Sequence, residues 1–311
     1  GNVVAIKPSE NAPRCGGHVT ERLSAALPEG VVTLVRGGAL TGEALVSRPE
    51  VDMVAMTGSS ATGRKILEAC APGLKRAVLE LGGKDPMIVF ADSDLKKAVR
   101  DCVRYSLWNS GQVCCAIERV YVEHAVVEDF KQDVVKLVEK KYGGKKGTRQ
   151  EIARLVNLAQ KEKVADQVEL AIRHGAEVLW RESEDATRER EESYYPITVL
   201  SDCTQSMGIM QEETFGPVIC ISSFNGSEEE AVRLANDSHY ALTAYVYSKD
   251  LDKANRVARS LKAGQVGINC YSIVNANAEC PWVGHKFSGY GCHSGLEGYR
   301  QFSSPKSLVQ Q

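Results

Sequence analysis

One short stretch of the chain has the composition of a nucleophile loop. Residues 109–119 read NSGQVCCAIER, in which Cys114 stands between a glycine-containing turn and an apolar run. A thiol between a helix and a strand can meet a substrate while both elements hold it in place. Attack requires the thiolate, and a free cysteine with a pKa of about 8.5 is only partly ionised at neutral pH. Cys114 is therefore the predicted nucleophile, and a base or a positive dipole must assist it.

Glu80 is the predicted base. It lies directly after an apolar run at residues 77–79, in the sequence ELGGKDP. We expect Gly82 and Gly83 to let the chain reverse sharply and to bring the carboxylate toward a neighbouring lobe. A glutamate before Gly-Gly is also an ordinary polar turn, so that this stretch alone leaves both interpretations open.

Both stretches resemble motifs of the aldehyde dehydrogenase superfamily. Residues 111–119 fit its GQxCxxxxR signature, and the separation of Glu80 and Cys114 (114 − 80 = 34) is that of the family. The resemblance implies that Cys114 attacks an aldehyde, that hydride leaves to a nicotinamide cofactor, and that Glu80 activates water to release the acid from a thioester. Relatives that pass the acyl group to coenzyme A lack this glutamate, so its presence favours hydrolysis.

A cofactor site is expected after the first apolar run. KPSE follows residues 3–6 and places Lys7 and Glu10 at a strand's carboxyl end, where α/β sheets bind ligands. The resemblance implies that both hold the adenosine ribose, and Glu10 would repel a 2′-phosphate, so NAD is expected in preference to NADP. The phosphate fingerprint GxGxxG is absent there, as in the family. The glycine-bearing turns and the helix start expected to meet the cofactor contribute Gly38, Gly58, Ser59 and Gly63.

Later motifs extend the resemblance to the nicotinamide and the substrate. QEETFGPV resembles EEIFGPV, which implies that Glu213 binds the nicotinamide ribose and that Phe215 packs near the nicotinamide. From the residues alone, Phe215 with the next two residues is equally a turn with a core aromatic. INCY, at residues 268–271, resembles the family's substrate-pocket loop. The residues expected to line the aldehyde entrance are Val113, Cys115, Asn269 and Tyr271.

These residues require an α/β framework. Strand and helix patterns alternate along the chain, with a helix predicted from about residue 18 to 27, a strand at 86–90 and a helix capped near Asp92 or Ser93. The resemblance implies an incomplete Rossmann-like cofactor-binding domain and an α/β catalytic domain, followed by a short strand that pairs subunits in a dimer or tetramer. The predicted limits are residues 1–82, 83–285 and 286–311.

Composition excludes several other classes of function. The 311 residues are 43% hydrophobic and carry a formal charge of -2, which gives no bias toward nucleic acid or anionic membranes. Ten cysteines form no CxxC pair and six histidines are scattered, so neither a disulfide framework nor a metal site is expected, and a metal-dependent hydrolase is excluded. The sequence has no run of about 18 apolar residues, and its first residues, GNVVAIKP, lack the charged, apolar and small-residue zones of a signal peptide. The expected location is the cytoplasm or an organelle matrix.

Two hypotheses about function remain open. The chain begins in an apolar run, and the asparagine that would complete the family's oxyanion hole lies upstream of KPSE and is not in the sequence. We expect a fragment, the carboxyl-terminal two thirds of a dehydrogenase, and the alternative is a truncated, non-catalytic binding or interaction protein with the same fold. The intact Cys114, Glu80 and Glu213 favour the enzyme. Two segments fit the family least or not at all: residues 142–157 depart from its pattern, and residues 181–192, nine of them charged, are predicted to form a solvated loop.

Overall fold

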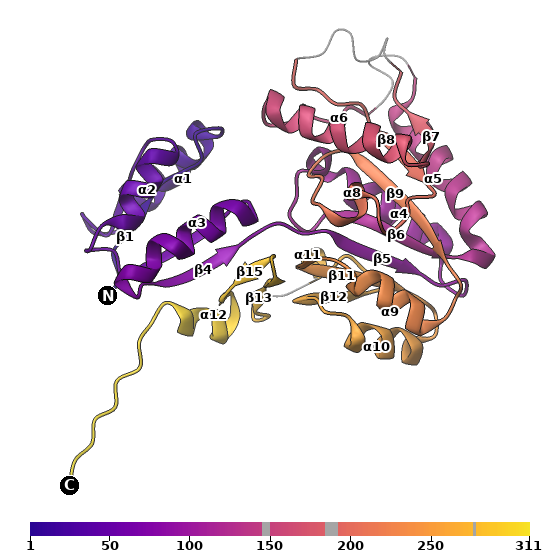
Figure 1. Cartoon of the computed structure of the whole chain (residues 1–311). Helices are drawn as coiled ribbons and strands as arrows, with labels where there is room; N and C mark the ends of the chain where they lie inside the picture. The colour runs from indigo at the N-terminus through magenta and orange to yellow at the C-terminus, as the bar shows by residue number, and fades with distance from the viewer. Residues whose placement is uncertain (145–149, 184–191, 276–277) are drawn as a thin grey trace. The chain divides into compact units, whose positions relative to one another are not determined.

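The chain divides into two compact units (Figure 1). The structure is a computed structural model that describes residues 1–144, 150–183, 192–275 and 278–311. The first unit comprises residues 1–56 and 61–77, and the second comprises residues 57–60 and 78–311. The domain limits at residues 82 and 285 stay predictions.

A parallel β-α-β arrangement opens the first unit. Strands β1 and β2 pair in parallel with Val4 opposite Val32, as the α/β pattern predicts. Helix α1 begins at Pro13, earlier than predicted, because proline suits the first position of a helix, where its missing N–H leaves no bond unmade. The elements that start in this part of the chain are β1 (Val4–Ile6), α1 (Pro13–Ala26), β2 (Val32–Leu34), α2 (Ala39–Ser47), β3 (Met53–Thr57), α3 (Ser60–Cys70), a 3-10 turn (Ala71–Gly73) and β4 (Arg76–Glu80).

A mixed sheet forms the centre of the second unit. Among the described residues it has seven strands in the order β12-β11-β5-β6-β9-β8-β7. All neighbours run parallel except β7, which is antiparallel to β8. The strands are β5 (Asp85–Val89), β6 (Ile117–Glu123), β7 (Glu177–Arg181), β8 (Thr198–Ser201), β9 (Val218–Phe224), β11 (Thr243–Tyr247) and β12 (Gln265–Ile268).

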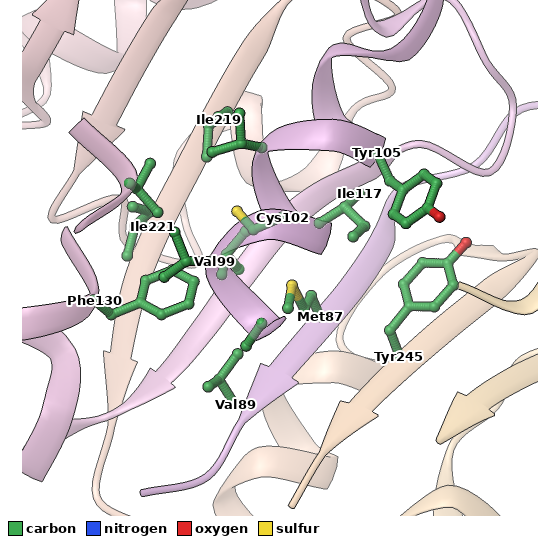
Figure 2. Close-up of a cluster of buried hydrophobic side chains, with 14 of the residues drawn as sticks. Met87, Val89, Val99, Cys102, Tyr105, Ile117, Phe130, Ile219, Ile221 and Tyr245 are labelled. Carbon is green, nitrogen blue, oxygen red and sulfur yellow. The ribbon is translucent and has the colours of Figure 1, made fainter. Parts of the chain in front are cut away.

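Helices cover both faces of this sheet, so its central strands are apolar on both sides. Met87 and Val89 pack with α4 (Leu95–Leu107) and α5 (Val127–Tyr142), as Figure 2 shows. Ile88 and Phe90 belong to the opposite cluster. The helices of that cluster are α6 (Leu158–Arg173), α8 (Gly208–Gln211), α9 (Glu228–Asn236) and α10 (Leu251–Ser260).

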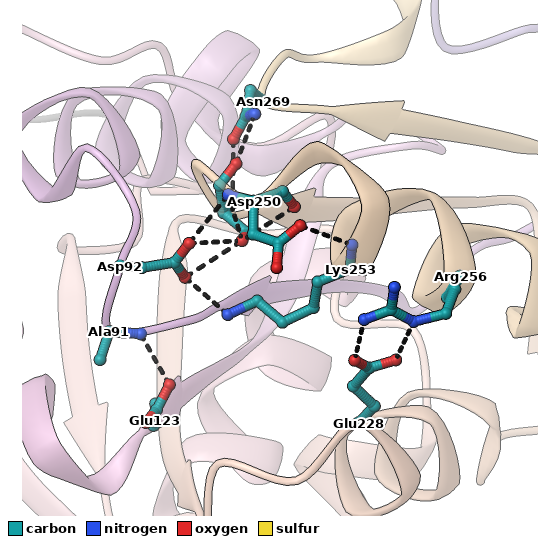
Figure 3. Close-up of polar contacts among 9 residues, drawn as sticks. Ala91, Asp92, Glu123, Glu228, Asp250, Lys253, Arg256 and Asn269 are labelled. Carbon is teal, nitrogen blue, oxygen red and sulfur yellow. Dashed lines mark hydrogen bonds and ion pairs between the residues drawn. The ribbon is translucent and has the colours of Figure 1, made fainter.

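The start of α4 differs from its prediction. Asp94 is the N-cap and accepts a hydrogen bond from the Lys97 N–H at 3.0 Å. Asp92 instead accepts from the Ser248 hydroxyl and from the Lys253 amine, both at 2.8 Å (Figure 3). Burial opposes ionisation of Asp92, but these donors prevail and lower its pKa to about 2. The cap predicted at Asp92 or Ser93 is wrong because this carboxylate is committed to residues distant in sequence.

Short elements complete the second unit. Gly289 of β15 pairs antiparallel with Glu80 of β4. Arg181 ends β7 and Glu182 is buried, so the start of the predicted solvated loop is wrong, while residues 184–191 lie outside the described residues, as do 145–149. Residues 304–311 form neither helix nor strand, and the subunit-pairing strand stays a prediction. The remaining elements are 3-10 turns at Trp108–Gly111 and His124–Val126, β10 (Tyr240–Ala241), α11 (Ser272–Asn275), β13 (Trp282–Val283), β14 (His285–Lys286), β15 (Gly289–Tyr290), β16 (Cys292–His293) and α12 (Gly295–Gln301).

No helix in the described part of the chain has both the length and the apolar character of a membrane span.

The core cluster beneath α5 predicts a large effect of truncation. Phe130→Ala removes a side chain that is 1% exposed and should lower the free energy of unfolding by about 3 to 5 kcal/mol. Leu296→Ala, at a position that is 61% exposed, is the control and should change it by less than about 0.5 kcal/mol. Urea unfolding followed by circular dichroism measures both, and equal effects would contradict the packing described here.

Candidate active site

A strained turn presents the predicted nucleophile. Between α4 and β6 the backbone is left-handed at Asn109, Ser110 and Gly111. A Cβ on Gly111 would lie 2.0 Å from the Gly216 carbonyl oxygen, so only glycine fits there. The Ser110 hydroxyl donates to the Ala153 carbonyl at 2.7 Å and anchors the turn.

Cys114 follows this turn and is half-buried. A hydrogen bond from the Cys115 thiol lowers the pKa of Cys114, although burial and the nearby carboxylates of Glu213 and Glu80 oppose ionisation. The same hydrogen bond raises the pKa of Cys115, whose side chain is fully buried. Of the two neighbouring thiols, Cys114 is thus the one that ionises more readily. The charges of Glu213 and Glu80 act on it, so both carboxylates lie near Cys114.

The predicted pocket residues Cys115 and Tyr271 lie together. The Tyr271 hydroxyl is 3.2 Å from the Cys115 sulfur and donates to the Cys115 carbonyl at 3.1 Å. Its ring stacks on Tyr105 with centroids 3.9 Å apart. Val113 is half-buried against the same cluster. Tyr271 therefore holds the nucleophile loop through its contacts with Cys115, and its part in binding an aldehyde stays a prediction.

Glu80, the predicted base, stands at the end of β4. The Trp282 indole N–H donates to its Oε2 at 2.5 Å, and the His293 Nε2 lies 3.7 Å from its Oε1. Oε1 is buried and has no hydrogen-bond partner among the described residues. Burial raises the pKa of Glu80 to about 7, against the effect of the Trp282 bond. A carboxylate that titrates near neutrality, with one free oxygen, is suited to accept a proton from water. Sequence reasoning missed Trp282, which is distant from Glu80 in the chain.

Gly82 and Gly83 do not make the predicted reversal. Neither has a positive φ, and residues 81–84 form no turn. Their role is to leave space, because a Cβ on Gly82 would lie 2.7 Å from a Glu213 carboxylate oxygen and one on Gly83 would lie 2.2 Å from the Cys114 carbonyl oxygen. The two glycines let Glu213 and the nucleophile loop approach the same backbone segment.

A buried ion pair holds the segment that carries Glu213 and Phe215. The Lys84 amine lies 2.6 Å from Glu118 and also donates to the Thr214 hydroxyl at 2.9 Å. Glu118 in turn accepts the N–H groups of Thr214 and Phe215 at 2.8 and 2.9 Å. Sequence reasoning missed this pair, because Lys84 in GGKDP and Glu118 in CAIERV are distant in the chain and share no local pattern.

Glu213 itself is held against the Gly83 backbone. Its Oε1 accepts the Gly83 N–H at 3.0 Å. Burial, followed by the charge of Glu118, raises the pKa of Glu213 to about 7. The structure therefore brings Glu213 to the nucleophile.

Arg119, the last residue of the predicted signature, is structural. Its side chain is fully buried and donates to the carbonyls of Lys84 and Ala235, both at 2.8 Å, and of Leu234 at 3.1 Å. Leu234 and Ala235 lie in the last turn of α9, where a cation also interacts favourably with the helix dipole. Arg119 joins the end of this helix to the segment that follows Gly83.

Asn269 is committed to the end of β11 (Figure 3). Its amide oxygen accepts the Ser248 N–H at 3.0 Å, and its amide nitrogen donates to the Ser248 carbonyl at 2.8 Å. Because both ends of the amide are engaged, we assign Asn269 a structural contact, and its place at the aldehyde entrance stays a prediction.

In the first unit, the predicted ribose-binding residues lie close together. The Lys7 amine donates to the carbonyls of Pro8 and Gly37 at 3.0 Å and lies 3.5 Å from the Glu10 carboxylate. Gly38 is the N-cap of α2, and a Cβ there would lie 3.9 Å from Glu10. A cation and an exposed carboxylate thus meet at the carboxyl ends of two parallel strands.

The remaining predicted phosphate contacts lie around the start of α3. The Gly58 N–H donates to the Glu80 carbonyl at 2.9 Å. Ser59 is exposed just before the helix, and Gly63 is buried inside it. Within the described residues, no group of three His, Cys, Asp or Glu side chains could hold a metal ion.

Comparison with known proteins agrees with this geometry. Residues 1–308 match the model of the aldehyde dehydrogenase family. The chain belongs to this family. It is 39% identical to a betaine aldehyde dehydrogenase of Bacillus subtilis over 315 aligned residues, which cover 100% of this chain and 64% of that protein.

Solved structures of aldehyde dehydrogenases share the fold. Lactaldehyde dehydrogenase from Escherichia coli superposes with a TM-score of 0.89 at 36% identity, over 97% of this chain and 63% of that one. An aldehyde dehydrogenase of Mycobacterium tuberculosis complexed with NAD+ gives 0.92 at 32% identity, over 99% and 63% of the two chains. The chain thus spans less than two thirds of the length of these relatives.

The electrostatics of this aldehyde dehydrogenase chain predict that Cys114 is its most reactive thiol. At about pH 6.5, thiols with an ordinary pKa are almost fully protonated, whereas the lowered pKa of Cys114 leaves more thiolate. Limited iodoacetamide labelling with peptide mapping measures this, with Cys114→Ser as the control. Cys102, whose pKa burial raises to about 12, should stay unlabelled. Faster labelling of Cys102 or Cys270 would refute the assignment.

Breaking the buried ion pair should lower the free energy of unfolding more than breaking an exposed pair. Lys84→Met leaves Glu118 charged and unpaired in the interior and should cost about 3 to 5 kcal/mol of unfolding free energy. Arg300→Met, which breaks the exposed pair with Glu297, should cost less than about 1 kcal/mol. Chemical denaturation measures the free energy of unfolding of both variants. Similar losses would show that the burial of the Lys84–Glu118 pair does not raise the cost of breaking it.

Proposed function

We propose that this chain carries the nucleophile and the base of an NAD-dependent dehydrogenase that oxidises an aldehyde to a carboxylic acid. The observation that supports this most is the proximity of a thiol with a lowered pKa, Cys114, to a carboxyl that titrates near neutrality, Glu80. The environment of Glu80 does not serve folding, since a buried carboxyl oxygen without a hydrogen-bond partner is unfavourable, and this supports a functional role for Glu80.

The side chains have separate tasks in this reaction. The Cys114 thiolate adds to the aldehyde carbon and forms a thiohemiacetal. A bound nicotinamide would accept the hydride that leaves this carbon. The resulting thioester on Cys114 is hydrolysed by a water molecule whose proton passes to Glu80, which releases the carboxylic acid and restores the thiolate. The Cys115 thiol stabilises that thiolate before attack and after release.

The residues present fit a dinucleotide in each unit taken separately. Lys7, Glu10 and Gly38 offer donors and a carboxylate suited to ribose hydroxyls, and the negative charge of Glu10 supports a preference for NAD over NADP. Glu213 and Phe215 would hold the nicotinamide ribose and the ring. A betaine aldehyde dehydrogenase of Staphylococcus aureus, 34% identical to this chain, was solved in complex with NAD+.

The setting of the enzyme is part of the same proposal. We place it in the cytoplasm or an organelle matrix, and a 38% identical relative from Elephantulus edwardii is a cytosolic aldehyde dehydrogenase. We also propose a homo-oligomer paired through the tail at residues 300–310, in which Leu308 and Val309 are almost fully exposed. No nucleic-acid or membrane partner is proposed.

The release step can be tested without a hydride acceptor. An activated ester such as 4-nitrophenyl acetate should acylate Cys114, and the acyl group should then leave at a rate that falls as pH drops through about 7, because Glu80 accepts a proton only when ionised. Glu80→Gln should retain acylation and slow release by on the order of a hundredfold or more. Mass spectrometry of the acylated chain after rapid quenching measures both steps.

Two controls sharpen the test. Trp282→Phe removes the hydrogen bond that lowers the pKa of Glu80, so the midpoint of the pH profile should move upward. Cys114→Ala should abolish acylation. If the acyl group resides elsewhere, or leaves equally fast from Glu80→Gln, the chain is better described as a non-catalytic member of the family.

A further inference from the structure

A row of buried polar groups lies beneath the nucleophile loop, and the proposed chemistry does not use it. Asp85, Thr243 and Tyr245 are all at most 1% exposed. One Asp85 oxygen contacts the Thr243 hydroxyl, and the other accepts the Thr243 N–H at 3.1 Å. The Thr243 hydroxyl lies 2.6 Å from the Tyr245 hydroxyl, which lies 2.8 Å from the Cys115 carbonyl oxygen.

Counting the hydrogens of the hydroxyl groups gives the donor and the acceptor of each contact in this row. A carbonyl only accepts, so the single hydrogen of the Tyr245 hydroxyl must point to Cys115. The contact between Tyr245 and Thr243 then requires the single hydroxyl hydrogen of Thr243. With an ionised Asp85, Thr243 would donate to the carboxylate and Tyr245 to Thr243, which leaves the 2.8 Å contact between Tyr245 and the Cys115 carbonyl without a hydrogen. A proton on the Asp85 carboxyl group supplies a hydrogen for every contact of the row.

We propose that Asp85 is a neutral carboxylic acid, and that its proton begins a one-way chain of hydrogen bonds through Thr243 and Tyr245 that positions the backbone of the nucleophile loop. Asp85 is then a positioning residue for Cys114, at a distance of several bonds from the reacting atoms. This role rests on the function proposed above, whereas the protonation state does not.

The charges around Asp85 agree with a neutral acid. Among the described residues no lysine or arginine forms an ion pair with it, since the Lys84 amine is bound to Glu118 and the Arg119 guanidinium is bound to carbonyls. The other ionisable groups that face it are Cys114, Cys115, Glu118, Tyr245 and Tyr271, none of them a cation. Burial raises the pKa of Asp85 well above its ordinary range, and the charges of Cys114 and Glu118 raise it further against the Thr243 bonds.

The sheet is shaped to accept this side chain. The register of β5 against β6 shifts between Asp85 and Pro86. Proline has no N–H to give to a ladder, and such an irregularity in a central strand redirects a side chain. Tyr245 lies at the edge of the apolar cluster in Figure 2, beside Met87, which is its partner in the sheet.

The chain of hydrogen bonds ends where it can orient the thiols. The Cys115 carbonyl receives the hydroxyls of both Tyr245 and Tyr271. The next residue is held by a bond from the Ala116 N–H to the Val113 carbonyl at 3.0 Å. With this backbone fixed, the Cys115 thiol is directed to Cys114, whose pKa it lowers.

The protonation state is tested with the 311-residue chain and Asp85→Asn, which cannot titrate and keeps one donor and one acceptor. Infrared difference spectra of the chain minus this variant should contain the carbonyl stretch of a protonated acid at pH 7. Because the unfolded state ionises Asp85 above about pH 4, the unfolding constant of the chain relative to Asp85→Asn should rise about tenfold per pH unit above that value. A carboxylate band, or a ratio independent of pH, would overturn the proposal.

The positioning role is tested with two tyrosines of strand β11. Tyr245→Phe removes the donor to the Cys115 carbonyl and should slow the alkylation of Cys114 about tenfold or shift its pH profile upward. Tyr247→Phe is the matched control, because the buried Tyr247 hydroxyl donates to Asp101 at 2.9 Å and takes no part in the row of hydrogen bonds from Asp85 to Cys115. Equal alkylation rates in the two variants would refute the role. If Cys114 is never acylated, the proposed function fails, and the infrared and pH results still decide the state of Asp85.

Discussion

The candidate active site depends on one close approach of backbone. Gly82 and Gly83 leave room for the Glu213 carboxylate on one side and the Cys114 carbonyl on the other, and any side chain there would lie within 2.7 Å of one of them. This packing places the residues before the glycines, including Glu80, and those after them, Lys84 and Asp85, around the same loop. Because Gly82 and Gly83 have no side chains, residues that are far apart in the sequence can meet at one site.

Low polarity around this segment has opposite consequences for its charged groups. Lys84 and Glu118 face each other as an ion pair, and Glu118 also accepts two backbone N–H groups. Asp85 has no such partner among the described residues, and the direction of its hydrogen bonds requires a proton. At Glu80 and Glu213 the same burial moves the pKa to about 7, where a carboxyl group can gain or lose a proton under ordinary conditions. Structural and reactive groups therefore share one physical environment.

Local patterns predicted most of the framework. The strand expected at residues 86–90 is β5, and the helix expected after it is α4, whose buried residues recur every three or four positions. In the same way, Ser227 caps α9 by accepting the Glu230 N–H. These features follow from periodicity and from contacts within one turn of a helix, which the sequence records directly. Two of the predictions that were wrong, the cap of α4 and the reversal at Gly82, depended on residues elsewhere in the chain.

The sequence by itself determined the family and predicted Cys114 as nucleophile and Glu80 as base, because both stand in short motifs whose spacing is visible along the chain. Only the tertiary structure decided which groups control them. Trp282 is hydrogen-bonded to Glu80 at a separation of 202 residues in the sequence, and Thr243 to Asp85 at a separation of 158 residues. Such contacts have no local signature, since each is created by strands that pair in the sheet or by segments that fold back on it. The charge of a buried group depends on these neighbours, and for this reason the state of Asp85 was decided by packing and not by residue type.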